Sequence, residues 1–503
     1  RPNVQKYTVA RGQPVKCRGD PGGRRWSDGT RVRYSLGKRA VEASHRSIAR
    51  AALISLAATV AGFPARGRPD YPGSPDGAGR TPETVPEEGL PTGAPLVTEP
   101  RPEGFEPPAC SLRRPVCVHR ASVVPESVAA VALTALESAY ERLVLALRLP
   151  SPERDRGRGG TDGLDLYLFP PEPAARGEVE LALDPVDPWG FDRASGSCRA
   201  VAASAVDLAR TAALCVGEAV AARLDPAATP SLRRAYALHL WLATGAPTGT
   251  DLAVIEDAQV TPERAVASRD QGPAGTAGAA LLLEHLDATR GGGGPGALAT
   301  GLLAAAASDT RAEALTWNDE PDLLDVLRHT LGARPAETAQ LFGGFAVARG
   351  FLGSRDDYTH FPRLTTVGDA GRIRFDWSLP LSTLPRRVAT TRPIEPTGSV
   401  YVWIDLDEVL TRGRLGFEAE WEPPATFQWS LVRVSADGRE LSRVSAPYQE
   451  RTTSAVQHLD DLASAAAVVI VGTNLGGRGP GRPHDPDLAP LVPSGCTVYV
   501  TPL

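Results

Sequence analysis

Hydrophobic residues recur with two different periods along this chain of 503 residues. Between about residues 200 and 350 they repeat at helical spacing, and Pro and Gly interrupt the pattern, which predicts a series of helices. The expected helices span residues 200–224, 230–244, 275–289, 296–307, 321–331 and 335–350. From about residue 365 onward they alternate with polar residues, as at Phe427, Trp429 and Leu431. This alternation predicts short strands.

The same reasoning predicts a smaller set of elements before the helical stretch. Residues 116–119, 164–169 and 178–183 have the composition of short strands. Pro125 opens an expected helix that continues to about Leu147, because Pro is well placed in the first turn of a helix. Two strands, at 164–169 and 178–183, are therefore expected directly before the helical stretch.

These patterns predict an α+β fold with two folded domains. Residues 109–360 form a mainly helical domain, and residues 365–503 form a C-terminal antiparallel β-sandwich. Within the sandwich, Asp437-Gly438 lies between two apolar stretches, which is typical of a hairpin turn.

The N-terminal part of the chain has a different composition. Residues 1–63 have a net charge of +10, although the whole chain has a net charge of −5. Basic residues precede a short apolar run at 51–63, followed by small residues, which is the pattern of a secretory signal peptide. A buried Ala-rich helix is the alternative. Residues 64–108 contain twelve Pro and are expected to be a disordered linker.

The leader predicts where the protein acts and which partners it lacks. We expect a secreted, periplasmic or cell-envelope protein, with no membrane span in the mature chain because the apolar run is too short. A basic leader on an acidic body does not indicate a nucleic-acid partner.

Five cysteines follow the leader, and export permits disulfides. Cys110 and Cys117 could close a small loop, and Cys198 could pair with Cys215 if it precedes the helix. An odd number leaves at least one thiol free or paired between chains. Buried free thiols remain an alternative for Cys215 and Cys496.

The most informative motif lies in the helical stretch at residues 214–221, Leu-Cys-Val-Gly-Glu-Ala-Val-Ala. It aligns with the H-E-x-x-H helix, in which two His bind zinc and the Glu is the general base. Glu218 keeps the Glu position, whereas Gly217 and Ala221 occupy the two His positions.

A second segment, Trp241-Leu242-Ala243-Thr244-Gly245-Ala246, strengthens this alignment. It resembles the helix that carries the third zinc ligand in gluzincin-type secreted metallopeptidases, with Thr244 at the Glu position. The resemblance implies a degenerate member of that family, with a β-sandwich after the peptidase domain and a groove for an extended peptide.

The resemblance also implies that catalysis is lost. Gly217 and Ala221 offer no side-chain donor and a Thr hydroxyl is a poor zinc ligand, so we expect no zinc and no other cofactor. Glu218 is then a vestigial residue in a pseudopeptidase that binds a peptide or protein. The alternatives are an active secreted hydrolase with an unrecognised site and a purely structural envelope protein.

Other candidate sites are less specific. Asp405 and Asp407 lie on one face of a strand end and could bind calcium, although acidic residues that end an edge strand are the preferred interpretation. No two of the eight His are four residues apart, so no helix offers a His pair. His239 lies on an apolar helix and is expected to be a core or groove histidine. No G-x-S-x-G motif is present.

Overall fold

The computed structural model describes the part of the chain that begins at Pro100. The described residues are 100–170, 179–185, 194–201, 204–266, 272–291, 294–307, 321–331, 334–355, 357, 359–406, 413–477 and 491–503. They belong to one compact unit. The predicted leader and most of the predicted linker lie outside the described residues.

The first layer is a five-stranded mixed sheet with the order β1-β2-β3-β5-β4. Three parallel strands form its centre: β2 (Val116–Arg120), β3 (Leu164–Phe169) and β5 (Ala194–Val201). The edge strands β1 (Ala109–Cys110) and β4 (Glu180–Pro185) run antiparallel to their neighbours. The alternation of apolar residues predicted β2, β3 and β4 but missed β1 and β5.

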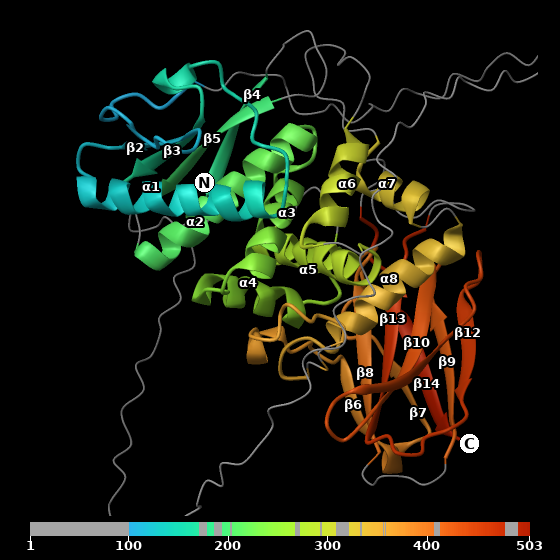
Figure 1. Ribbon diagram of the computed structural model, residues 1–503. Helices are drawn as coiled ribbons and strands as arrows, with labels where there is room; N and C mark the ends of the chain where they lie inside the picture. Colours follow the sequence, from blue (N-terminus) through green and yellow to red (C-terminus); the bar gives the residue numbers. More distant parts are fainter. Residues whose placement is uncertain are drawn as a thin grey trace, which may run out of the picture. The chain divides into compact units, whose positions relative to one another are not determined.

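Two helices pack against one face of this sheet (Figure 1). They are α1 (Glu126–Tyr140), which continues into the π-helical segment Glu141–Ala146, and α2 (Ala205–Leu224). Leu136 of α1 and Leu166 of β3 belong to one hydrophobic core and are fully buried. Burial of such apolar surface is the main favourable contribution to folding.

The remaining helices continue this core. The structure has eight α-helices among the described residues, and the six predicted after residue 200 all appear within a few residues of their expected bounds. The prediction missed α4, whose start Thr248 forms a capping box with Asp251. The later helices are α3 (Pro230–Thr244), α4 (Gly249–Val260), α5 (Pro273–Arg290), α6 (Ala297–Ala306), α7 (Leu323–Thr330) and α8 (Pro335–Arg349).

Two further sheets form the C-terminal sandwich, in the orders β11-β10-β13-β8-β6 and β12-β9-β14-β7. Every pair is antiparallel except β6 with β8, which is parallel. Their bounds are β6 (Trp377–Pro380), β7 (Arg386–Ala389), β8 (Ser399–Asp405), β9 (Leu415–Trp421), β10 (Phe427–Val434), β11 (Glu440–Ser445), β12 (Ser454–Leu459), β13 (Ala467–Asn474) and β14 (Cys496–Pro502).

Helix α8 covers the outer face of the first of these sheets. Its residues Ala346 and Val347 pack with Tyr401, Val432 and Val469, and all five are buried. The Tyr401 hydroxyl donates a hydrogen bond to the carbonyl of Ala346 at 2.6 Å. Strand β13 is therefore buried on both faces, which explains its continuous apolar sequence.

The predicted hairpin turn is present between β10 and β11. Gly438 has a φ of 86°, which favours glycine, and the amide of Ser435 donates to the carbonyl of Arg439 at 2.9 Å. The predicted α+β class is confirmed: apart from α1, which lies between β2 and β3, the helices follow the first sheet and the sandwich strands follow the helices.

Candidate functional site

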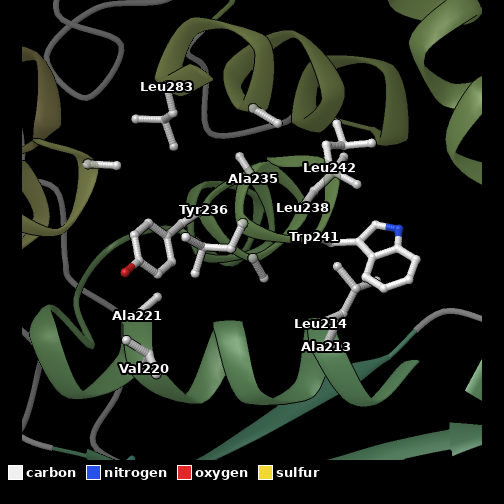
Figure 2. Packing of buried hydrophobic residues seen from close by; sticks show 14 of the residues in the cluster. Ala213, Leu214, Val220, Ala221, Ala235, Tyr236, Leu238, Trp241, Leu242 and Leu283 are labelled. Atoms are coloured by element: carbon white, nitrogen blue, oxygen red, sulfur yellow. The ribbon is translucent and has the colours of Figure 1, made fainter. Parts of the chain in front are cut away.

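Helices α2 and α3 form an antiparallel pair that carries Glu218 and the three predicted ligand positions Gly217, Ala221 and Thr244. Only residues 225–229 join them, and a connection this short makes helices antiparallel neighbours. Thr229 caps α3 by accepting a hydrogen bond from the amide of Leu232 at 3.2 Å, and Pro230 occupies the first turn. Figure 2 shows the apolar side chains between the two helices.

Gly217 lies at a close approach of α2 and α3. A Cβ built on Gly217 would be 2.7 Å from the Cβ of Ala237 and 2.8 Å from its Cα. Atoms this close overlap, so no side chain fits here without moving α3. Ala221 is also fully buried in the core between the helices (Figure 2). Gly217 and Ala221, which occupy the two His positions of the H-E-x-x-H motif, therefore form a tight contact with α3.

The structure does not bring Thr244 to this contact. Ala237 faces Gly217, and Thr244 is seven residues further along α3, about 10 Å along the helix axis. The hydroxyl of Thr244 donates to the carbonyl of Leu240 at 2.7 Å, within its own helix. The short connection determines this register, which the spacing of residues in the sequence did not reveal.

These residues do not fit a zinc ion. Zinc in proteins takes Cys, His or carboxylate ligands at about 2.0–2.3 Å, and it needs space between them. Gly217 and Ala221 supply no donor, and the Cβ of Ala237 fills the space beside Gly217. Across the described residues, no group of three or more His, Cys, Asp or Glu is arranged to hold a metal.

Glu218 is the predicted residue with the most informative surroundings. Its side chain is nearly buried, and one carboxylate oxygen accepts a hydrogen bond from Nε of Arg234 at 3.1 Å. Arg234 also donates through Nη2 to the carbonyl of Val179, next to the edge strand β4. A guanidinium from α3 thus neutralises the carboxylate that the resemblance assigns to the general base.

A groove opens beside this ion pair. It has a volume of about 240 Å³ and is lined by Val179, Arg210, Leu214, Arg234 and Leu238, together with residues at the starts of α4 and α5. The walls are apolar with two guanidinium groups, as in small ligand sites that combine apolar walls with a few polar groups.

A buried network supports one wall of this groove. The Nε of Arg210 donates to Asp251 at 2.6 Å, and the indole Nε1 of Trp241 donates to the other oxygen of Asp251 at 2.8 Å. Asp251 is fully buried and also accepts from the amide of Thr248 at 2.8 Å. Charge-assisted hydrogen bonds of this kind hold Arg210 and the start of α4 in place.

His239 lies in the core and away from the groove. It is fully buried; Nε2 is 2.5 Å from an oxygen of Asp287, and Nδ1 is 3.2 Å from an oxygen of Glu284. Burial opposes protonation, but the two carboxylates outweigh it and raise the pKa of His239. Asp287 also accepts hydrogen bonds from the amides of Gly296, Leu298 and Ala299 at the start of α6. The cluster therefore joins α3, α5 and α6.

Both candidate disulfide pairs are bonded in the structure. Cys110 and Cys117 join β1 to β2, and Cys198 and Cys215 join β5 to α2 one turn before Glu218. Cys496 is a buried free thiol, and burial raises its pKa to about 12. A thiol with such a pKa is unreactive.

The proposed calcium pair is only partly within the described residues. Asp405 is the last residue of β8 and is exposed, whereas Asp407 lies outside the described residues. The calcium site stays a prediction.

The sequence reasoning missed Arg234, Arg210 and Asp251. Arg234 follows Glu218 by sixteen residues, and a signal for the pair existed in the short connection between the two helices. A helical hairpin with so short a connection places residues 218 and 234 close together. The capping pair Thr248 and Asp251 was likewise visible in the sequence.

Comparisons with known proteins leave the family open. No protein-family model matches the chain, and no curated protein matches. Among solved structures, the pre-peptidase C-terminal domain of a Bacillus anthracis collagenase is 8% identical; the match covers 25% of this chain and 97% of that one, with a TM-score of 0.17. The Yersinia pseudotuberculosis-derived mitogen is 14% identical over 24% of this chain and 86% of that one, with a TM-score of 0.16.

A third match is Aeromonas hydrophila PliG, a periplasmic inhibitor of g-type lysozyme. It is 7% identical over 25% of this chain and its whole length, with a TM-score of 0.16. Likeness at this level gives no family and no activity. Within the described part of the chain, no helix has the length and apolar character needed to cross a membrane.

Proposed function

We propose that this protein is an exported, non-catalytic homologue of gluzincin-type peptidases that binds an extended peptide or protein segment in the groove beside Glu218. The observation that carries the proposal is the ion pair between Glu218 and Arg234, because Arg234 also lines the groove. The general base of a metallopeptidase must be free to take a proton from a metal-bound water. Here the carboxylate is engaged with a guanidinium instead.

The helix packing supports the loss of catalysis independently. Restoring a His at position 217 would require α2 and α3 to separate, since even a methyl group there overlaps Ala237. The site therefore differs from a peptidase by its backbone packing as well as by three side chains.

The position of the groove supports a peptide ligand. Val179 lines it and directly precedes β4, which lies at the edge of the sheet. An extended peptide can add to a sheet edge through main-chain hydrogen bonds, with pockets for alternate side chains. Arg210 would favour an acidic group on such a peptide, although Asp251 already engages its Nε.

A binding experiment on the full chain tests the proposal. The probe is a fluorescein-labelled tryptic digest of casein, followed by fluorescence anisotropy with and without a chelator. Thr250 is exposed and lines the groove, so Thr250→Trp should narrow it and weaken binding roughly tenfold. Ala253→Trp, on the exposed side of the same helix, is the matched control and should bind normally.

Two outcomes would overturn the proposal in different directions. Stoichiometric zinc retained through dialysis, with peptide hydrolysis lost in Glu218→Gln and with chelator, would establish an active metallopeptidase. Absence of binding, or equal binding by Thr250→Trp and the wild type, would favour the structural envelope protein.

A further inference from the structure

A second groove runs along the outer side of α1 and shares no lining residue with the first. Its volume is about 440 Å³, and small side chains such as Ala130, Thr134 and Ala135 line it together with Ala209 of α2. Arg142, in the π-helical segment that follows α1, lines it as well. The groove is thus an apolar surface with one cation toward its C-terminal end.

Arg142 has no anionic partner in the described part of the chain. Its guanidinium lies over the Trp241 ring at 5.4 Å, and its buried Nε has no hydrogen-bond partner. The neighbouring Glu141 forms an ion pair with Arg114 at 2.9 Å. Burial lowers the pKa of Arg142 because no carboxylate offsets the loss of water. A half-buried cation without a counter-ion lowers the stability of the fold, because the charge loses water and gains no anion in return. A ligand that supplies the anion would explain it.

The local backbone is unusual at the same place. Residues Glu141–Ala146 form a π-helical segment, which is rare and frequently marks functional sites. The irregular segment carries the one unpaired cation of the groove, so two separate features coincide at Arg142.

The walls restrict what an anion here could be. The hydroxyl of Thr134 already donates to the carbonyl of Ala130 at 3.0 Å, so the groove offers few free polar groups. A peptide would leave its amides unsatisfied on such a surface. A carboxylate takes two parallel hydrogen bonds from a guanidinium, and an alkyl chain suits walls of Ala and Val.

We propose that this groove binds an aliphatic monocarboxylate, with its carboxylate on Arg142 and its alkyl chain along α1 toward Ala130. The segment from Ala130 to Arg142 covers about 18 Å of helix, which is long enough for a medium-length chain. No bond is made or broken in this binding.

Octanoate is the probe, titrated into the full chain by isothermal calorimetry below its micelle-forming concentration. We expect saturable binding of octanoate to one site. Octan-1-ol and octylamine should bind more weakly by roughly tenfold or more, because neither can form a bidentate ion pair with a guanidinium. Equal binding of octanol, or no saturable binding of octanoate, would contradict the proposal.

Three variants locate the site. Arg142→Gln should weaken octanoate binding roughly tenfold or more, whereas Arg142→Lys should keep part of the affinity. Ala209→Trp should fill the part of the groove that holds the alkyl chain of octanoate, while Arg142 is unchanged. Arg113→Gln, at an exposed position outside the groove, is the control and should bind like the wild type. If Arg142→Gln binds octanoate normally while its circular dichroism is native, Arg142 is not the anchor.

Discussion

Glu218 and His239 lie on adjacent helices, and both belong to residue types that often carry out catalysis. The side chain of Glu218 forms an ion pair with Arg234, and Arg234 is about one-third exposed and lines a groove. His239 is enclosed between Asp287 and Glu284 with no exposed surface. A ligand in the groove could reach Arg234, the partner of Glu218, whereas His239 has no exposed surface. The complete burial of His239 between two carboxylates indicates a structural role, and Glu218 is the residue for which we propose a functional one.

Removing the imidazole of His239 should have the largest effect on stability. His239→Ala leaves Asp287 buried without its cationic partner and leaves Glu284 with Arg363 at 3.4 Å, and losing one member of a buried charged cluster costs about 3–5 kcal/mol. Urea unfolding followed by circular dichroism measures the change. A loss below about 1 kcal/mol would mean that the amides at the start of α6 alone compensate Asp287.

Gly217→His tests whether the helix contact or the missing side chain prevents metal binding. Overpacking at Ala237 should destabilise the protein by about 1–3 kcal/mol, and the variant should bind no zinc. Gly301→His, at an exposed site on α6 with open space around it, is the matched control and should cost less. Stoichiometric zinc in Gly217→His would show that α3 can move aside.

The pKa of one buried histidine is lowered and the pKa values of two others are raised, so stability should depend on pH in opposite directions on the two sides of pH 6.5. Burial and the positive charges of His360 and Arg443 lower the pKa of His285 to about 4. Between about pH 4 and 6.5 the unfolded chain then binds more protons, so the free energy of unfolding should rise with pH, by up to about 1.4 kcal/mol per unit. Carboxylate hydrogen bonds outweigh burial and raise the pKa of His239 and His360, so stability should fall again above pH 6.5.

Urea unfolding at a series of pH values measures this profile. His285→Asn should flatten the acidic side, and His360→Gln should reduce the slope on the basic side. His360 bridges Asp357 and Glu440 of β11 at 2.9 and 2.8 Å, so its effect reports on the contact with the sandwich. An acidic slope that persists in His285→Asn would assign it to carboxylates instead.

Glu218→Gln should have the smallest effect on stability. The amide oxygen of Gln can still accept a hydrogen bond from Arg234, and Arg234 keeps its contact with the Val179 carbonyl and its access to water, so we expect a loss of about 1 kcal/mol or less. The same urea experiment compares it directly with His239→Ala. A loss as large as that of His239→Ala would mean that Glu218 is a structural core residue, and the comparison between the two sites would fail.

Much of the fold was predictable because it depends on local periodicity. The helix at 230–244 was predicted with the bounds that the structure shows, since Thr229, Pro230 and Gly245 mark its ends. Strand β5 was missed because Ala194–Val201 contains small and polar residues with little apolar alternation. The preceding strand β4 and the more distant strand β3 supply its hydrogen bonds, which its own residue pattern does not reveal.

The candidate site was predictable only in part. The motif predicted Glu218 on a helix beside a second helix, but the position of Thr244 followed only from the residue spacing in the family that the chain resembles. The connection at 225–229 sets a register in which Ala237 faces Gly217, and counting could not reveal it. The contact between Arg234 and Glu218 depends on how the two helices pack against each other.

The sequence by itself determined which segments become helices and strands, which cysteines were available to pair, and which residues lack metal-binding side chains. Those properties depend on neighbours within a few positions or on residue identity alone. Only the tertiary structure decided that Glu218 meets Arg234, that His239 meets Asp287, and that Arg142 meets no carboxylate in the described part of the chain. Each depends on how distant helices pack, because the free energy of a charge is set by the groups that replace its water.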